Sequence, residues 1–256
     1  MKFAMLRPEQ IRAAVQANVP VLMAAGVMEY HGPHLPIGTD FLIANSICEA
    51  VEERVECVLF PPLPYGPTLS WAGDAEDGEM DFDSEPFFRY TQEMFRHITA
   101  MGFRRIYVLQ HHQGPEGLQV LCLKRAAMEV VREMTAAWGS EWGRADPAGL
   151  PVPNIFSMIQ IAALDTFSQY PGPLPGPVPV GHAGKGETQL IMGAYPETVR
   201  MDALDSLPFL PEWLEDASRA SPAEGRAWLE FCIVGWVHEL EKGRAISQAA
   251  EDGKVL

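Results

Sequence analysis

Hydrophobic residues along this chain follow two periods, and their order predicts an α/β protein. Continuous hydrophobic runs at 19–25 and 105–110 are typical of strands buried on both faces of a parallel sheet. Shorter hydrophobic runs predict two further strands, at 57–60 and 152–161. Elsewhere hydrophobic residues recur every three or four positions and predict helices, at 8–18, 40–54, 84–101, 116–137 and 223–242. We therefore expect a single domain over residues 1–256, with a mainly parallel sheet flanked by helices.

The polar segment from Glu29 to Asp40 interrupts this pattern directly after the first predicted strand. Glu29 and His31 alternate with Tyr30, so extended backbone would place both side chains on one face, where a metal ion can meet them. Asp40 opens the next helix, where its carboxylate could cap the helix or turn inward as a third ligand. Such oxygen and nitrogen ligands suit Zn, Mn or Fe. The alternative is a tight turn whose polar groups face water, because Glu-x-His is common by chance.

The wider segment E-x-H-G-x-H-L-P-x-x-T-D resembles the signature of the creatininase (creatinine amidohydrolase) family of metal-dependent hydrolases. The resemblance implies a three-layer creatininase-like fold. It also implies that Glu29, His31 and Asp40 bind a pair of divalent metal ions, with Asp40 bridging the two. It gives His34 no role as a metal ligand, and we expect His34 to orient a ligand or to stabilise the loop.

A second polar segment, His111-His112-Gln113-Gly114, follows the strand at 105–110, at the end where parallel sheets place their ligand sites. It resembles the family's Asn-Gly-His segment, and the resemblance implies that His112 is a metal ligand. Gly114 stands where creatininase has a Glu that completes its second metal site, so we expect an activity other than that of creatininase itself. We expect His111 and Gln113 to bind substrate, with His111 as an alternative additional ligand.

A third segment, His182-Ala-Gly-Lys-Gly-Glu187-Thr, resembles the family's His-Ala-Gly-x-x-Glu-Thr-Ser. The resemblance implies that His182 is the proton-transfer residue. Glu187 could supply the carboxylate that Gly114 lacks, as a metal ligand and catalytic residue, or it could only stabilise a helix N-terminus. Lys185 replaces a Glu found in many relatives, and we expect it to face a polar or anionic substrate group.

Two irregular segments have less specific patterns. Residues 61–86 are first proline-rich and then acidic; we interpret the acidic run as a solvated face, Trp71 as a pocket wall or an interface residue, and Ser84 as a helix cap. The proline-rich run at 171–179 predicts a rigid surface loop, with a lid or a subunit contact as the alternative.

Composition narrows the classes of partner. The formal net charge of −15 disfavours binding to nucleic acid or to anionic membranes. No hydrophobic run reaches the roughly 18 residues of a membrane span and no signal region opens the chain, so we expect a cytoplasmic protein. The four isolated cysteines are expected to be small core residues. Family resemblance implies a homo-oligomer, with a hexamer as one form.

These observations predict hydrolysis by a water activated by one or two divalent ions. The leading hypothesis is cleavage of a C–N bond in a small cyclic or formyl amide. The alternative is ring opening at a C–C bond of an oxidised inositol, a cyclic diketone such as 3-dehydro-scyllo-inosose. A non-catalytic metal-binding relative is the third hypothesis.

Overall fold

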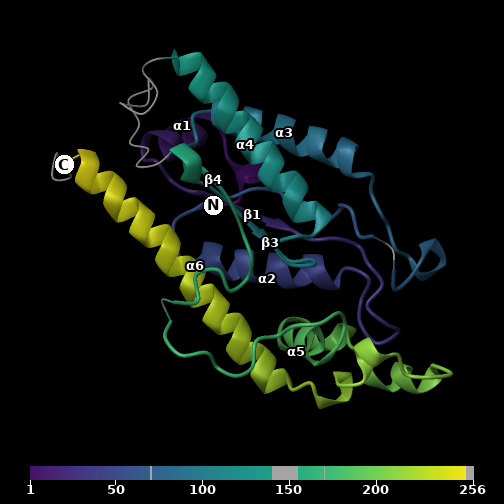
Figure 1. Ribbon diagram of the computed structural model, residues 1–256. Helices are drawn as coiled ribbons and strands as arrows, with labels where there is room; N and C mark the ends of the chain where they lie inside the picture. The colour runs from purple at the N-terminus through teal and green to yellow at the C-terminus, as the bar shows by residue number, and fades with distance from the viewer. Residues whose placement is uncertain (70, 140–154, 170, 252–256) are drawn as a thin grey trace.

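A four-stranded parallel sheet lies at the centre of the protein (Figure 1). The structure is a computed structural model that describes residues 1–69, 71–139, 155–169 and 171–251. The strands are β1 (Val21–Ala25), β2 (Val58–Leu59), β3 (Ile106–Gln110) and β4 (Ile159–Ala162), in the order β2-β1-β3-β4. All four predicted strands are therefore confirmed, although they are shorter than predicted. Of the last one, 152–154 lie outside the described residues and Ile155–Ser157 form a 3₁₀ turn.

Helices cover both faces of the sheet (Figure 1). Helices α1 (Pro8–Gln16), α3 (Ser84–Ala100) and α4 (Leu118–Trp138) pack on one face, and α2 (Thr39–Arg54), α5 (Lys185–Ala194) and α6 (Pro222–Glu251) pack on the other. Successive strand residues point to opposite faces. Val21 and Met23 consequently belong to one core, whereas Leu22 and Ala24 belong to the other. This arrangement confirms the three-layer α/β fold.

The helix boundaries follow local chemistry. Pro8 and Pro222 open α1 and α6, since proline at a first helical position gives up no needed N–H. Asp83, and not the predicted Ser84, caps α3: its carboxylate accepts a hydrogen bond from the Glu85 backbone N–H at 3.0 Å. Short 3₁₀ turns complete the described chain, at Phe3–Met5, Ala75–Asp77, Pro196–Thr198, Met201–Ser206, Glu212–Leu214 and Ala217–Arg219.

Two glycines allow the close approaches that position the loops at the carboxyl edge of the sheet. A Cβ at Gly26 would collide with the backbone of Phe41, so the segment after β1 can approach the start of α2 this closely only with glycine at this position. A Cβ at Gly225 would collide with the Gln189 carbonyl, so this glycine lets α6 pack directly against α5. The first contact fixes the start of α2 beside the end of β1, and the second fixes α5 against α6.

The acidic run is only partly a solvated face, which corrects the sequence-based interpretation. Glu79 is buried, and its carboxylate accepts hydrogen bonds from the Thr68 hydroxyl at 2.8 Å and from the Tyr30 backbone N–H at 3.3 Å. Asp81 accepts from the Thr68 backbone N–H at 2.7 Å. Glu79 ties the long loop to the segment that follows β1, because a buried acceptor needs donors, and Asp81 joins two parts of the loop itself.

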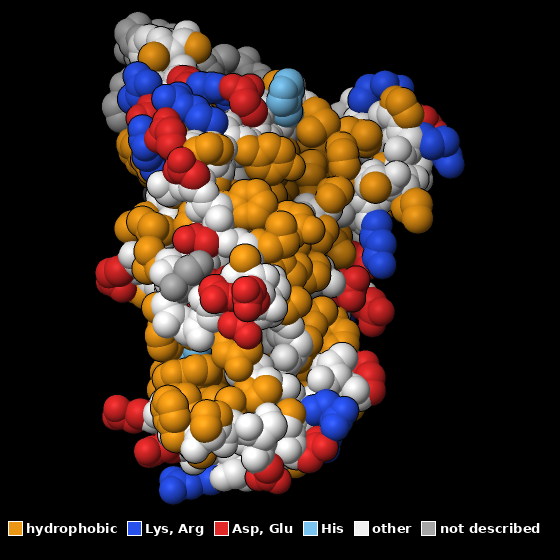
Figure 2. Space-filling model, turned by 90° about the vertical axis from the view of Figure 1, so that its right-hand side faces the viewer, with side chains coloured by type: hydrophobic (Ala, Val, Ile, Leu, Met, Phe, Trp, Pro, Cys, Tyr) orange, Lys and Arg blue, Asp and Glu red, His pale blue; other side chains and the backbone are white. Residues whose placement is uncertain are grey.

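The cysteines and the surface add two observations. Cys48, Cys57, Cys122 and Cys232 are all buried with free thiols, as expected for small core residues. Hydrophobic side chains spread over much of the face shown in Figure 2, with Asp and Glu side chains between them. Within the described ranges, every helix is too short or too polar to cross a lipid bilayer.

Candidate metal centre

The segment after β1 carries the first two candidate ligands in an irregular loop. β1 ends at Ala25, so the strand geometry that would have placed Glu29 and His31 on one face does not extend to them. The loop brings them together differently: the Glu29 backbone N–H donates to the Ile37 carbonyl at 3.0 Å, and His31 Nδ1 donates to the Glu29 carbonyl at 2.9 Å. Both side chains are buried, and His31 Nε2 faces Asp40 and Glu187.

Asp40 turns inward and does not cap α2, whose N-cap residue is Gly38. Its carboxylate lies between two imidazoles, with Oδ2 2.9 Å from His112 Nδ1 and Oδ1 3.5 Å from His31 Nε2. One oxygen thus faces each side of the site. The structure therefore favours the ligand orientation over the capping role.

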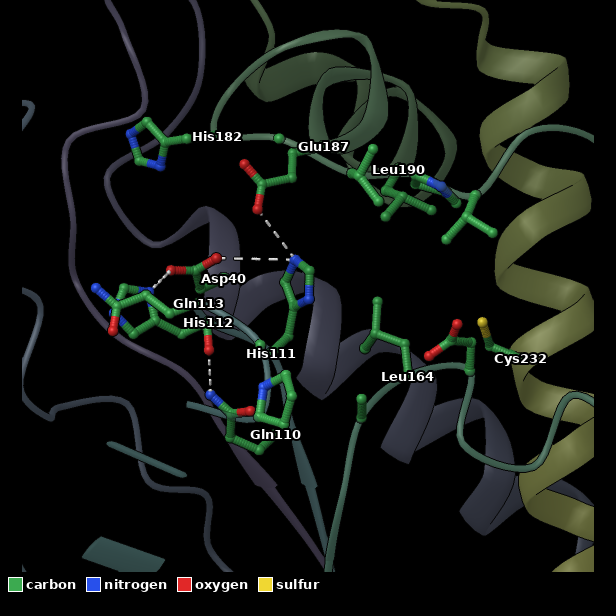
Figure 3. Close-up of a pocket in the computed structure, with 18 of the residues that line it drawn as sticks. Asp40, Gln110, His111, His112, Gln113, Leu164, His182, Glu187, Leu190 and Cys232 are labelled. Atoms are coloured by element: carbon green, nitrogen blue, oxygen red, sulfur yellow. Dashed lines mark hydrogen bonds and ion pairs between the residues drawn. The ribbon is translucent and has the colours of Figure 1, made fainter. Parts of the chain in front are cut away.

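The end of β3 holds two adjacent histidines by its backbone. The His111 N–H donates to the Ala25 carbonyl at 3.0 Å, and the Gln110 side chain donates to the His112 carbonyl at 2.7 Å. His112 Nδ1 then lies 3.1 Å from Glu29 Oε2. His111 Nε2 lies 3.3 Å from Glu187 Oε1 and points between Glu187 and Asp40 (Figure 3).

A tight turn before α5 positions Glu187. Ala183 has a φ of +52°, in the left-handed region, and its N–H donates to Glu187 Oε2 at 2.6 Å. The same oxygen lies 3.4 Å from His31 Nε2. Glu187 therefore reaches the cluster besides occupying the first turn of a helix.

His182 lies in an aromatic setting beside the cluster. Its Nε2 donates to the Tyr30 carbonyl at 2.7 Å, and its Nδ1 lies 3.8 Å from Glu29 Oε2. The rings of Trp71 and Trp213 are centred 4.9 and 5.1 Å from the imidazole. These contacts fix the ring while leaving Nδ1 on the side of the carboxylates.

Two donor groups share Asp40 and could each hold an ion. The first donor group is Glu29, Asp40 and His112, and the second donor group is His31, Asp40 and Glu187. A further set, Glu29, His31 and His182, overlaps both. In the described part of the chain, Glu29 Oε1, His31 Nε2 and His111 Nε2 are buried without a hydrogen-bond partner. Such atoms are costly to bury unpaired, and a bound cation would satisfy them.

His31 makes the fit to a cation specific. Its Nδ1 donates to a carbonyl, so the neutral ring presents a lone pair at Nε2 to the carboxylates of Asp40 and Glu187. Three electron-rich atoms at these distances repel one another unless a proton or a metal ion lies between them. A ligating imidazole held by its other nitrogen on a carbonyl is the usual arrangement at metal sites.

The electrostatics of the cluster point the same way. Burial alone would raise the pKa of Glu187, but His31 and His111 outweigh it and lower the pKa to about 2. For His112 the effect of burial has the opposite sign and would lower the pKa, but Asp40 and Glu29 raise it to about 10. Glu187 therefore stays charged and attracts positive charge, whereas burial raises the pKa of Glu29. A divalent ion would displace protons from the cluster.

His34 joins the loops and does not join the cluster. The Thr188 hydroxyl donates to the Ala183 carbonyl at 3.0 Å, so His34 Nε2 must donate to Thr188 Oγ1, at 2.9 Å. Burial lowers the pKa of His34 to about 4. His34 is therefore a neutral bridge between the segment after β1 and the start of α5, which agrees with its expected role in stabilising the loop.

A cavity of roughly 560 Å³ opens beside the cluster. One side carries Asp40, His111, His112, His182 and Glu187, and the other carries Leu164, Leu190 and Cys232 (Figure 3). Trp71 and Gln113, both predicted to bind substrate, line it as well. The Gln113 amide N–H donates to the Thr68 carbonyl at 2.9 Å, which leaves Oε1 unpaired within the described residues.

Lys185 does not reach this cavity, contrary to expectation. Its ammonium pairs with the Glu224 carboxylate of α6 at 2.7 Å. The structure adds residues that the sequence pattern did not identify, chiefly Trp213 beside His182 and the α6 side chains Trp228 and Cys232. Val178 and Pro179 of the proline-rich run also line the cavity. Of these residues, only Trp213, an isolated aromatic residue in an irregular segment, could have been singled out from the sequence.

Comparisons with known proteins bear on the family and the fold. The family model described as Creatininase: Creatinine amidohydrolase matches residues 4–240. A creatinine amidohydrolase from Pseudomonas putida is 26% identical over 89% of this chain and 91% of its own length. A 3-dehydro-scyllo-inosose hydrolase from Thermotoga maritima is 24% identical over 82% of this chain and 62% of its own length. Two creatininase structures, one named as the Mn form and one as a Zn–Zn type, superpose with TM-scores of 0.70 at 21% identity. The alignments cover 94% of this chain and 98% and 97% of those chains, and they show the fold.

Proposed function

The chain belongs to the creatininase family, and on that premise we propose that it is a divalent-metal-dependent hydrolase whose substrate binds in the cavity beside Asp40. The observation that supports this most is the position of Asp40 between two groups of buried nitrogen and oxygen donors. The first donor group and the second donor group would each hold one ion, with Zn, Mn or Fe as the suitable metals. Ions bound there supply an activated water and polarise a carbonyl.

His182 is the proton carrier in this proposal. Its Nε2–H donates to the Tyr30 carbonyl, so in the neutral ring Nδ1 is the free acceptor. Its side chain is 14% exposed and lines the cavity, which makes Nδ1 accessible to a reacting water. An imidazole exchanges protons readily near pH 7. His182 would take a proton from the attacking water at Nδ1 and release it to the leaving nitrogen.

The favoured substrate is a cyclic or formyl amide that carries an apolar substituent. Gln113 lines the cavity, and its buried Oε1 has no hydrogen-bond partner among the described residues. On the opposite side, Leu164, Leu190 and Trp228 form an apolar wall. The cavity is also within the size range of pockets that bind drug-sized molecules, so it has room beyond a small ring.

Ring opening of an oxidised inositol is the second candidate, supported by the similarity to the Thermotoga maritima hydrolase and by the polar pair His111 and Gln113. The apolar wall weighs against it. An inositol-derived ring carries hydroxyl groups on all sides, and those facing Leu164 and Leu190 would lose water without gaining partners. Each such unpaired group costs about 1–3 kcal/mol.

A matched substrate screen tests the proposal. The protein would be loaded with Zn²⁺ or Mn²⁺ and assayed against lactams and formamides, each with and without an apolar N-substituent, and against cyclic diketones. We expect turnover of the substituted amides, lost in His182→Ala with metal content unchanged. Exclusive turnover of diketones would replace the first candidate by the second. A metal-loaded protein inactive on every class would support the non-catalytic relative.

Self-association is part of the same proposal. Hydrophobic side chains gather widely on the face in Figure 2, and large exposed apolar patches mark interaction surfaces. Exposed hydrophobic residues include Leu118, Leu121 and Met128 on α4. Light scattering coupled to size exclusion measures the mass directly, and a single species at 28.3 kDa across micromolar concentrations would contradict an oligomer.

A further inference from the structure

His111 has an unusual position for a substrate-binding side chain. Its Nε2 is buried without a hydrogen-bond partner among the described residues, and it faces two carboxylates, Glu187 Oε1 at 3.3 Å and Asp40 Oδ1 at 3.8 Å. Both carboxylates belong to the second donor group. A ring meant for substrate would direct its free nitrogen toward open cavity, whereas this one directs it into the cluster (Figure 3).

We propose that His111 is a protein ligand of the metal ion held by the second donor group, together with His31, Asp40 and Glu187. The proposal rests on the proposed function only in requiring that the cluster binds divalent ions. Glu187 would lie between the two imidazoles, with Oε2 toward His31 and Oε1 toward His111.

The distances between the donor atoms support this assignment. Ligand atoms ~2.0–2.1 Å from one zinc ion lie about 3.3 Å apart in a tetrahedron. The observed separations are 3.4 and 3.5 Å from His31 Nε2 to Glu187 and Asp40, and 3.3 and 3.8 Å from His111 Nε2 to the same two side chains. The two imidazoles thus approach the same pair of carboxylates at similar distances.

The backbone holds His111 in this direction. Its N–H extends the β1–β3 hydrogen bonding by donating to Ala25, and the adjacent His112 is fixed through Gln110. Gly114 has no side chain, and a Cβ there would contact nothing within 4 Å. Gly114 therefore offers no ligand atom to the second donor group. In this loop, His111 offers one.

The assignment has a consequence for metal choice. The first donor group offers one imidazole and two carboxylates, whereas the second with His111 offers two of each. Imidazole suits zinc, while carboxylate suits manganese. We therefore expect the two positions to differ in metal preference, with zinc favoured over manganese at the second.

Metal titrations of four proteins test the proposal: wild type, His111→Ala, His111→Glu and His97→Ala, whose histidine is exposed on α3. Each is stripped of metal, checked for folding by circular dichroism, and titrated with Zn²⁺, Mn²⁺ and Co²⁺ against a chromophoric chelator. We expect His111→Ala to weaken one of two zinc sites by at least about a hundredfold and to change the Co²⁺ absorption spectrum. Free imidazole should partly restore both. His111→Glu should raise the manganese-to-zinc affinity ratio of that site, and His97→Ala should match wild type.

The outcomes separate this inference from the proposed function. Two zinc sites of unchanged affinity and an unchanged Co²⁺ spectrum in His111→Ala would overturn the ligand role while leaving the hydrolase proposal intact. A folded wild-type protein that binds none of the three ions would overturn both.

Discussion

The first and second donor groups share Asp40 but differ in the exposure of their side chains and in the distances between their atoms. In the first, His112 Nδ1 lies 2.9 Å from Asp40 and 3.1 Å from Glu29, and these side chains are at most 2% exposed. In the second, Glu187 and His111 are 11% and 18% exposed and their contacts run from 3.3 to 3.8 Å. Both groups contain buried atoms without a hydrogen-bond partner among the described residues, Glu29 Oε1 in the first and His31 Nε2 in the second. The difference between the groups is therefore exposure, and because the second has the more exposed side chains we expect it to contact substrate.

Removing the shared carboxylate should have the largest effect. Asp40→Asn removes a charge that both groups use, so we expect metal content to fall from about two ions per chain toward none. Turnover should drop on the order of a thousandfold or more, about 4 kcal/mol of transition-state stabilisation. Elemental analysis and steady-state assays measure the two effects. Asp202→Asn, at an exposed carboxylate paired with Arg200, is the control. Retention of both ions would show that Asp40 does not join the two groups.

An isosteric substitution in each donor group tests whether the two groups bind metal ions independently. Glu29→Gln and Glu187→Gln each remove one negative charge from one group only, so each should reduce metal content from about two ions to one. Because the second group differs in exposure and donors, the two variants should keep ions of different preference, visible in zinc and manganese titrations. If Glu187→Gln binds two ions with wild-type affinity, Glu187 only stabilises the start of α5.

The same contrast explains what sequence could predict. The hydrophobic runs predicted every strand of the described chain, because a buried parallel sheet demands them. The first two polar segments contain the residues of the first donor group, and the third contains Glu187 of the second. Glu29 and His31 converge for a reason other than predicted, since loop hydrogen bonds and not strand alternation orient them. The second group depends on where α5 packs, which local pattern does not encode. For that reason Lys185 was wrongly expected in the cavity, and Trp213 was missed.

Changing His182 should affect chemistry and leave both donor groups occupied. His182→Ala removes the proton carrier, so we expect kcat to fall about a hundredfold to a thousandfold with little change in metal content. His182→Gln, which keeps a donor for the Tyr30 carbonyl, should be as inactive. Loss of an ion in either variant would instead assign His182 to the overlapping set with Glu29 and His31.

The smallest predicted effect is a change in folding stability with pH. It arises at His34, which supports the second donor group through Thr188. Its pKa is about 4 in the folded protein against about 6.5 when unfolded, so below pH 6.5 the unfolded chain binds a proton that the folded chain does not. The free energy of unfolding therefore falls as pH decreases, by about 2 kcal/mol from this residue between pH 8 and pH 5. His34→Gln keeps a donor for Thr188 and lacks this titration.

Denaturant unfolding of wild type and His34→Gln at both pH values isolates the effect. The histidines of the cluster are present in both proteins, so their contributions cancel in the difference. We expect the stability advantage of wild type to shrink by about 2 kcal/mol from pH 8 to pH 5. A constant difference would mean that His34 can be protonated in the folded state. The link through Thr188 to Ala183 and Glu187 would then have to tolerate a charge, and the second donor group would be less rigidly held than its hydrogen bonds indicate.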